Sequence, residues 1–422
     1  MIHIENEYIR EHLLDGNFGL EKESLRVLED GSFSHAPHPF EDDEHIVKDF
    51  CENQAEINTD VHTSIQGAAK ELREHNRRLI KEIGTREQRE YLWLFSNPPF
   101  IKDEEDIPVA KFDGLYTSKT FYRNYLADKY GRYKMTFSGI HFNYSFSDEM
   151  LQKDFLISRE KDFDEYRDRL YLNLAKGLVE YGWIMVAVTA ASPVLDGSFL
   201  EKGKLGESCF TGMASVRCSE LGYWNEFVPV LDYESLESYA KSIQRYVDEG
   251  LLNAPSELYY PIRLKSKGEN NLRVLSKSGV NHIELRMFDL NPLVENGIDE
   301  RDIFFAQLLI LWIASEPQKE LGASDQVRCV RNFKMAAHFD LETTKLIYRD
   351  GESLSMEEAG KALIERLKEF YADFSKEVME VLDFEYEKFA DKKKRYAWIV
   401  RERFSDYFAE KALRLARERQ VI

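Results

Sequence analysis

Pairs of acidic residues in one short segment of the chain could hold a cation. In GLEKESLRV, Glu21 and Glu23 are two residues apart. On a strand, side chains at this spacing point from the same face, so both carboxylates would lie together. Two like charges on one face are unfavourable unless a cation lies between them. The segment therefore favours either a cation site or an exposed strand edge.

A second acidic segment, KDFCENQAEIN, offers the same two interpretations. As one strand it places Glu52, Gln54 and Glu56 on one face, with Asp49 just before them. As a helix it would also bring Glu52 and Glu56 together, because residues four apart are neighbours on a helix. The carboxylates cluster under either assignment. A solvated acidic face remains the alternative to a metal site.

Two further segments add nitrogen ligands and positive charge. In MTFSGIHFNYSF, strand alternation sets His141 on a polar row with Gly139 and Asn143, and a glycine there permits close approach of another group. In NHIELRMFDLNP, Glu284 and Arg286 point the same way. They could simply pair with each other, or the glutamate could hold a metal while the arginine holds a phosphate.

Four strands that each present carboxylates or histidine on one face would suit oxygen-binding divalent ions. Mg²⁺ prefers carboxylates together with substrate phosphates, so the pattern predicts Mg²⁺ and ATP chemistry, with Mn²⁺ as an alternative ion. The usual nucleotide-binding motifs are absent. The segment nearest to a P-loop is GSFLEKGK, from Gly197 to Lys204, but it has five residues between its glycines instead of four and no Ser or Thr after the lysine. ATP would then be held by metal and arginine contacts to its phosphates.

The elements expected to position these side chains are short strands mixed with long helices. Alternating patterns predict strands over 18–27, 47–59, 134–146 and 280–290. Apolar residues at spacings of three and four predict helices over 65–83, 163–181, 303–314 and beyond Ser355, where Ser355 and Glu358 form a capping box. The absence of regular strand–helix alternation predicts an α+β fold with a mainly antiparallel sheet. Residues 355–422 should form a helical C-terminal layer, broken near 391–394.

Composition limits the possible partners, cellular compartment and domain organisation of the protein. With 57 Lys and Arg against 76 Asp and Glu, the net charge of −19 argues against a nucleic-acid partner. The four cysteines lack metal-ligand spacing, which indicates reducing cytoplasm. No apolar signal segment opens the chain, and 303–314 is too short to span a membrane. Without repeats or linkers, residues 1–422 should form a single catalytic domain.

Seven segments occur in an order that closely resembles the bacterial glutamate–cysteine ligase family: FGLEKESLRV, DFCENQAE, SGIHFNYSF, ASPVLDGSF, SVRCSELGYWN, ELYYPIRLK and HIELRMFDLNP. The resemblance covers about 18–292. It implies a fold related to glutamine synthetase and guanidino kinases, in which a curved antiparallel sheet forms a funnel-shaped active site. It also implies ATP-dependent joining of the glutamate γ-carboxyl to the amine of cysteine through γ-glutamyl phosphate, the first step of glutathione biosynthesis.

The resemblance also implies roles for individual residues. The implied metal ligands are Glu21, Glu23, Asp49, Glu56, His141 and Glu284, with Glu52 a neighbour of undefined role. Arg263 and Arg286 would face the ATP phosphates, and Arg286 and Glu284 would be the catalytic pair. Arg217 would bind glutamate, and the acceptor pocket would be lined by Phe50, Tyr122, Arg123, Tyr223 and Tyr259.

One position departs from the family pattern. Met135 stands near the acceptor pocket where family members carry glutamine, which exchanges an amide for an apolar thioether. A ligase of the same mechanism with another amine acceptor is therefore an alternative. A non-catalytic metal or nucleotide binder and a metal-dependent hydrolase also remain open. The chain shows no motif of the ATP-grasp module found in two-step glutathione synthases, so we expect the dipeptide product only.

Overall fold

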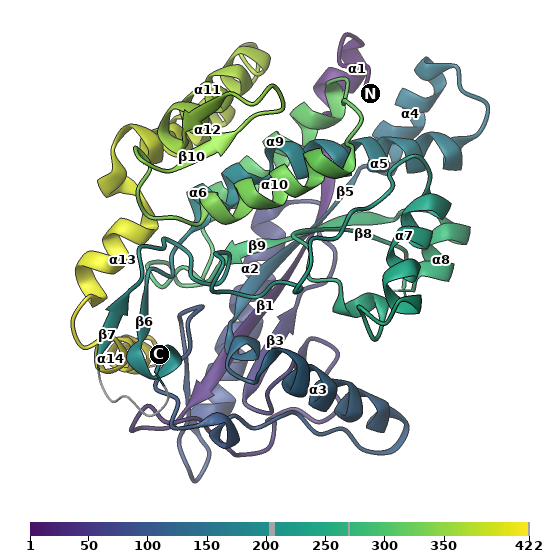
Figure 1. Cartoon of the computed structure of the whole chain (residues 1–422). Coiled ribbons are helices and arrows are strands. Elements are labelled where there is room, and N and C mark those ends of the chain that lie inside the picture. Colours follow the sequence, from purple (N-terminus) through teal and green to yellow (C-terminus); the bar gives the residue numbers. More distant parts are fainter. Residues whose placement is uncertain (202–206, 269–270, 421–422) are drawn as a thin grey trace.

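A mainly antiparallel sheet of seven strands forms the centre of the molecule (Figure 1). The computed structural model describes residues 1–201, 207–268 and 271–420. The strand order is β2-β3-β1-β5-β9-β8, and β4 pairs with the far end of β1. Their bounds are β1 Gly16–Val27, β2 Ile46–Lys48, β3 Gln54–Asn58, β4 Tyr91–Leu92, β5 Gly139–Phe146, β8 Ile262–Lys265 and β9 His282–Asp289. Every neighbouring pair in this sheet is antiparallel, as expected.

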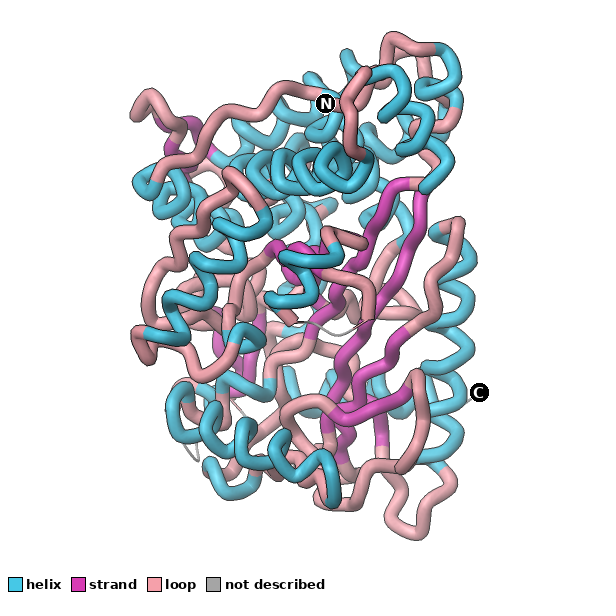
Figure 2. The backbone as a smooth tube through the Cα atoms, turned by 90° about the vertical axis from the view of Figure 1, so that its right-hand side faces the viewer, coloured by secondary structure: helices cyan, strands magenta, loops and turns pink. Residues whose placement is uncertain are grey.

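Apolar alternation defines the covered face of the sheet. On β5, the side chains of Ile140, Phe142 and Tyr144 are fully buried, because every second residue points into the helical layer. Helices α2 (Ile65–Gly84), α5 (Phe163–Tyr181), α6 (Trp183–Thr189) and α9 (Glu300–Ser315) contact this sheet or one another. Figure 2 shows the strands as a band through the middle of the chain with helices on either side. The α+β expectation is confirmed.

The remaining elements surround this centre. The other helices are α1 Glu7–Glu11, α3 Thr117–Tyr130, α4 Asp148–Ser158, α7 Leu236–Asp248, α8 Leu272–Ser278 and α10 Ala323–Ala336. Two small hairpins pair β6 (Val194–Asp196) with β7 (Ser208–Phe210), and β10 (Lys345–Ile347) with β11 (Ser353–Ser355). In Figure 1, α9 and α10 lie above the sheet and α3 lies below it.

The C-terminal region is helical, as predicted, over its described residues. It consists of α11 (Met356–Phe370), α12 (Lys376–Ala390), α13 (Tyr396–Phe404) and α14 (Phe408–Gln420), with a single turn at Lys392–Lys394 as the expected break. The capping box is confirmed, because the Ser355 hydroxyl accepts from the backbone of Glu358, whose carboxylate accepts in return. Residues 421–422 and part of the 197–204 segment lie outside the described residues.

Two strand predictions were wrong in extent. The expected strand over 47–59 is a hairpin of β2 and β3, because the chain turns tightly where Gln54 N–H donates to the carbonyl of Cys51. Glu52 falls in this turn, and its carboxylate accepts from Lys48 and from two backbone N–H groups rather than sharing a face with Glu56. The strand expected from Lys134 begins at Gly139, after a single 3₁₀ turn.

No helix in the described part of the chain is long and apolar enough to cross a membrane.

Candidate active site

Strand register brings the predicted carboxylates and histidine to one face of the sheet. Glu21 on β1 lies opposite His141 on β5, and Glu23 lies opposite Glu56 on β3. On the other side, Glu284 on β9 lies opposite Arg263 on β8 and Asn143 on β5. Directly opposite side chains on one face are near neighbours, so five strands contribute to one polar cluster.

His141 is the centre of the cluster. Its Nδ1 lies 3.0 Å from Glu21 Oε2 and 3.8 Å from Glu284 Oε1, and its Nε2 lies 3.6 Å from Glu23 Oε1. Glu21, His141 and Glu284 each offer a ligand atom within 4.8 Å of the others. Only 6% of His141 and 1% of Glu284 is exposed. Carboxylates with one imidazole, partly withdrawn from water, form a donor set that fits Mg²⁺ or Mn²⁺.

Neighbouring charges decide which carboxyls ionise, because burial opposes ionisation at each of them. At Glu284, Arg286, Lys265 and His141 overcome burial and hold the pKa well below its usual value. At Glu21, burial is outweighed by the hydrogen bond to His141, and the pKa is lowered. These two carboxylates are therefore charged at neutral pH before any cation binds.

On the other side of the cluster, the pKa values of two carboxyls are raised. Burial raises the pKa of Glu23, although His141 counteracts part of this shift. Burial, together with the charges of Asp49, Glu21 and Glu23, raises the pKa of Glu56 to about 8. A dication placed here would remove this repulsion, since it favours the charged form of every nearby carboxyl.

Asp49 lies beside this cluster but points partly toward Arg123. Its Oδ1 is 4.0 Å from the Arg123 guanidinium, and the Asp49 carbonyl accepts a 2.7 Å hydrogen bond from Arg123 Nε. Its negative charge nonetheless adds to the effect of burial in raising the pKa values of Glu23 and Glu56. Asp49 therefore lies at the edge of the cluster rather than at its centre.

Two site side chains complement the predicted set. Asn143, on the polar row with His141, donates from Nδ2 to Glu21 Oε1 at 2.9 Å. Lys265, which sequence reasoning missed, has its Nζ 3.5 Å from Glu284 Oε1. Lys265 follows Arg263 by two residues on β8, so strand alternation was a usable signal that it shares the face.

The arginines line the rim of the cluster. Arg286 NH1 lies 3.3 Å from both carboxylate oxygens of Glu284. Arg217 donates to the backbone carbonyl of Arg286 at 2.9 Å and packs over Gly139, where a Cβ atom would lie 2.3 Å from the guanidinium carbon. A side chain at position 139 would therefore displace Arg217. Gly139 also donates its N–H to Glu23 at 2.9 Å.

Arg263 is held differently from Arg286. Its guanidinium donates to the backbone carbonyls of Ser256 and Leu258, and burial next to Arg286 lowers its pKa. Arg263 still acts electrostatically on Glu284, its cross-strand neighbour.

The predicted acceptor-pocket residues other than Arg123 gather in one apolar cluster, whereas Arg123 lines the larger hollow described below. Phe50, Met135 and Tyr259 are buried in it, and Tyr122 and Tyr223 pack against it. The rings of Tyr223 and Tyr259 have centroids 4.0 Å apart. Met135, 3% exposed, thus belongs to the same apolar cluster as the aromatic side chains that the resemblance implied.

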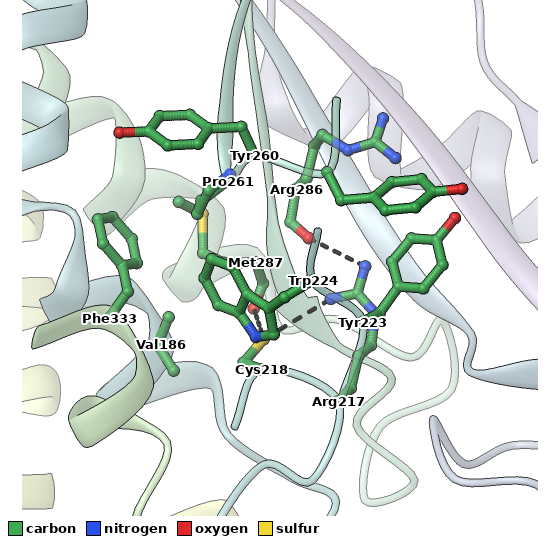
Figure 3. Close-up of a pocket in the computed structure, with 11 residues that line it drawn as sticks. Val186, Arg217, Cys218, Tyr223, Trp224, Tyr260, Pro261, Arg286, Met287 and Phe333 are labelled. Atoms are coloured by element: carbon green, nitrogen blue, oxygen red, sulfur yellow. Dashed lines mark hydrogen bonds between the residues drawn. The ribbon is translucent and has the colours of Figure 1, made fainter. Parts of the chain in front are cut away.

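Two hollows border these groups. A small cavity of about 50 Å³ is lined by residues that include Arg217, Tyr223, Tyr259 and Arg286, and Figure 3 shows the Arg217 guanidinium directed at the backbone of Arg286. A much larger hollow of about 1380 Å³ reaches the cluster at Glu56 and is lined by Lys48, Arg123 and many other residues. The larger hollow exceeds the volume typical of small-molecule sites.

The family model for glutamate–cysteine ligase matches residues 1–250 and 229–336. Among curated proteins, the glutamate–cysteine ligase of Clostridium acetobutylicum is 32% identical over 86% of this chain and 85% of its own length. The glutathione biosynthesis bifunctional protein GshAB of Clostridium perfringens is 34% identical over 87% of this chain. The match spans about half (48%) of that bifunctional relative.

Solved structures agree on the fold. A bifunctional glutathione synthetase from Pasteurella multocida matches with a TM-score of 0.85 and 26% identity, over all of this chain and 54% of that one. A glutamate–cysteine ligase from Francisella tularensis, solved in complex with AMP, matches with a TM-score of 0.87 and 19% identity, over 96% of this chain and 88% of that one. From the family model and the curated relatives together, the chain belongs to the glutamate–cysteine ligase family of enzymes.

Proposed function

We propose that the chain catalyses ATP- and Mg²⁺-dependent ligation of the γ-carboxyl of L-glutamate to the amino group of L-cysteine, the first step of glutathione biosynthesis. The observation that carries the proposal is the cluster of Glu21, His141 and Glu284 with Arg286 beside it. Membership in the family supports the reaction class. The relative crystallised with AMP supports an adenine nucleotide as cosubstrate.

The metal-binding face is assigned to the carboxylates and the imidazole. Glu21, Glu23, Glu56, His141 and Glu284 hold the divalent ion or ions, and Asp49 contributes from the edge of the cluster. When bound, Mg²⁺ neutralises charge on the phosphate oxygens and orients the transferred group. Asn143 and Asn58 position the oxygens of Glu21 and Glu56 by hydrogen bonds of 2.9 and 3.0 Å.

The phosphoryl step activates a poor acyl donor. An oxygen of the glutamate γ-carboxylate attacks the γ-phosphorus of ATP, ADP leaves, and γ-glutamyl phosphate forms. Arg286 stabilises negative charge on the transferred group, and Arg263 adds positive potential from the neighbouring strand. The neutral amine of the acceptor then attacks the acyl carbon, phosphate leaves, and the amine loses a proton.

The substrate-binding roles are assigned to residues around the metal-binding cluster. Arg217, held over Gly139 and directed along β9, binds the glutamate carboxylate. The acceptor is enclosed by Phe50, Tyr122, Arg123, Met135, Tyr223 and Tyr259. Because Met135 offers a thioether where an amide would hydrogen-bond, a different amine acceptor is the second candidate function.

The whole described chain is proposed to act as one catalytic unit in the cytoplasm. The C-terminal helices share an apolar cluster with the acceptor-pocket residues, through Phe404 and Phe408 of the tail and Met135 and Tyr259 of the pocket. The buried cysteines Cys51, Cys218 and Cys329 are not joined by disulfides, which is typical of a reducing compartment.

The test is coupled ADP release with Mg-ATP and glutamate, with and without cysteine, followed by a panel of other amines. Cysteine-dependent ADP release supports the main proposal. Turnover that needs glutamate and another amine, with no response to cysteine, supports the second candidate. ADP release that is indifferent to glutamate contradicts both.

A further inference from the structure

We propose that His45, Glu71 and His75 form a second metal site that binds a transition ion of the Zn²⁺ type. These three residues each offer a ligand atom within 4.8 Å of the others. They form the second such group that the described residues contain, and none of them belongs to the active-site cluster. The inference rests on its own geometry and does not depend on the ligase reaction.

Two elements supply the ligands. His45 immediately precedes β2, whereas Glu71 and His75 are four residues apart on α2 and therefore lie on one helix face. Glu71 Oε1 is 3.2 Å from His75 Nε2. The side chains of Glu71 and His75 are only 16% and 14% exposed, so both are partly withdrawn from water while remaining accessible to an ion.

Outer hydrogen bonds orient these ligands. His45 Nδ1 lies 3.0 Å from the carbonyl oxygen of Asn58, which can only accept, so Nδ1 carries the proton and Nε2 keeps a lone pair for an ion. The second oxygen of Glu71 accepts from His62 Nε2 at 2.6 Å and from the Asp60 N–H at 2.9 Å. Bonds of this kind, from a ligand's far side to carbonyl or N–H groups, are typical of metal sites.

The ligand chemistry selects a different ion from the active site. Two imidazoles and one carboxylate favour Zn²⁺, Co²⁺ or Ni²⁺, whereas the carboxylate-rich cluster around Glu284 suits Mg²⁺. The His45 and His75 rings are stacked, with centroids 4.5 Å apart and planes at 21°. Because an ion must lie in the plane of each imidazole that binds it, one ring turns out of the stack about its Cβ–Cγ bond on coordination.

A bound ion would fasten the β2–β3 hairpin to α2. Asn58 connects this site to the active site, because its carbonyl accepts from His45 while its side-chain amide donates to Glu56 Oε1 at 3.0 Å. Ligands that bind only the folded state stabilise it. A bound ion would therefore stabilise the position of β2 and β3 at this side of the sheet, and β3 carries Glu56.

The experiment is equilibrium dialysis of the full chain, stripped by a chelator, against Zn²⁺ in a large excess of Mg²⁺. His45→Gln and His75→Gln should each weaken Zn²⁺ binding by at least about tenfold. His12→Gln is the matched control, because it removes a histidine that also faces a single carboxylate, Asp15 at 2.7 Å. It should bind Zn²⁺ as the unaltered chain does.

Circular dichroism and thermal unfolding in chelator identify any variant that has lost its fold, and visible absorption of bound Co²⁺ provides a second readout for the same set. Unchanged Zn²⁺ affinity in folded His45→Gln and His75→Gln overturns the proposal. So does loss of the bound Zn²⁺ in Glu284→Gln with retention in His75→Gln, since the ion would then lie in the active-site cluster.

Discussion

At the scale of single residues, Glu284 connects the metal-binding and phosphate-binding sides of the active site. It is buried, it lies 3.8 Å from His141, and both its oxygens are 3.3 Å from Arg286. Glu284→Gln keeps the shape of the side chain but removes the charge that the ion and the arginine need. ADP release should fall by at least about 100-fold.

Circular dichroism and thermal unfolding provide the control for this variant. Glu300→Gln, on the first turn of α9 and 40% exposed, removes a carboxylate charge elsewhere and should leave turnover unchanged. Near-normal ADP release in a folded Glu284→Gln protein would rule out the metal assignment.

Glu56 gives the active site a dependence on pH. Its pKa is raised to about 8, so most of the metal-free protein holds a proton there at pH 7. Since Mg²⁺ binds the carboxylate, binding at pH 7 should release about one proton, and affinity should rise from pH 6 to about 8. Calorimetry in buffers of different ionisation enthalpy measures this release.

The raised pKa of Glu56 also determines how this carboxyl changes the stability of the folded protein with pH. The folded pKa lies above the ordinary value of 4.5, so the contribution of this carboxyl to stability is fully present below pH 4.5 and is lost as pH rises through about 8. Glu56→Gln should weaken both dependences, and the rest should come from Glu23, whose pKa is also raised. Mg²⁺ affinity that is constant between pH 6 and 9 in the unaltered chain contradicts the account.

Strand alternation predicted much of the site at the residue scale. It paired Glu21 with Glu23 and Glu284 with Arg286 correctly on one face. It could not place Glu52, because a tight turn interrupts the alternation there. The proximity of His141 to Glu284 depends on pairing between strands separated by more than 130 residues, and the sequence carries no local signal for that pairing.

At the scale of elements, the helix α11 begins at a capping box that can be tested. The Ser355 hydroxyl accepts from the backbone of Glu358, whereas Ser375 at the start of α12 makes no such side-chain bond. Ser355→Ala should cost about 1 kcal/mol in the free energy of unfolding. Ser375→Ala, the matched control, should cost clearly less. Urea denaturation followed by circular dichroism measures both, and equal losses would contradict the cap assignment.

Helix periodicity located elements better than strand alternation did. The prediction over 163–181 agrees with α5 residue for residue, because its apolar face packs on the sheet. The strand predicted over 47–59 was wrong as one element, because β2 and β3 are each too short for alternation to reveal the turn between them. Short strands are specified by their partners more than by their own sequence.

At the scale of the molecule, the C-terminal tail closes the cluster that lines the acceptor pocket. Phe408 on α14 packs edge-on against Trp93 and Phe95, with centroids 5.9 and 5.2 Å away, and is 1% exposed. Phe408→Ala should lower the free energy of unfolding by about 3 kcal/mol or more. Arg414→Ala on the same helix, 69% exposed, should change it by less than about 0.5 kcal/mol.

Urea denaturation of these two variants decides the point. A loss in Phe408→Ala no larger than in Arg414→Ala would show that the tail is not part of the core. The sheet order itself could not be predicted from alternation or composition, since β5 and β9 pair directly although five helices, α4 to α8, and three strands, β6 to β8, lie between them in the sequence. The family resemblance implied a curved antiparallel sheet but not the order of its strands.

The most direct test of the central claim is one reaction with Mg-ATP, cysteine and glutamate whose γ-carboxylate carries ¹⁸O in both oxygens, with both products measured by mass spectrometry. The account predicts inorganic phosphate that carries one ¹⁸O and a γ-linked dipeptide that keeps the other, because the carboxylate oxygen leaves with the phosphoryl group. Unlabelled phosphate released alongside the dipeptide would contradict activation through γ-glutamyl phosphate.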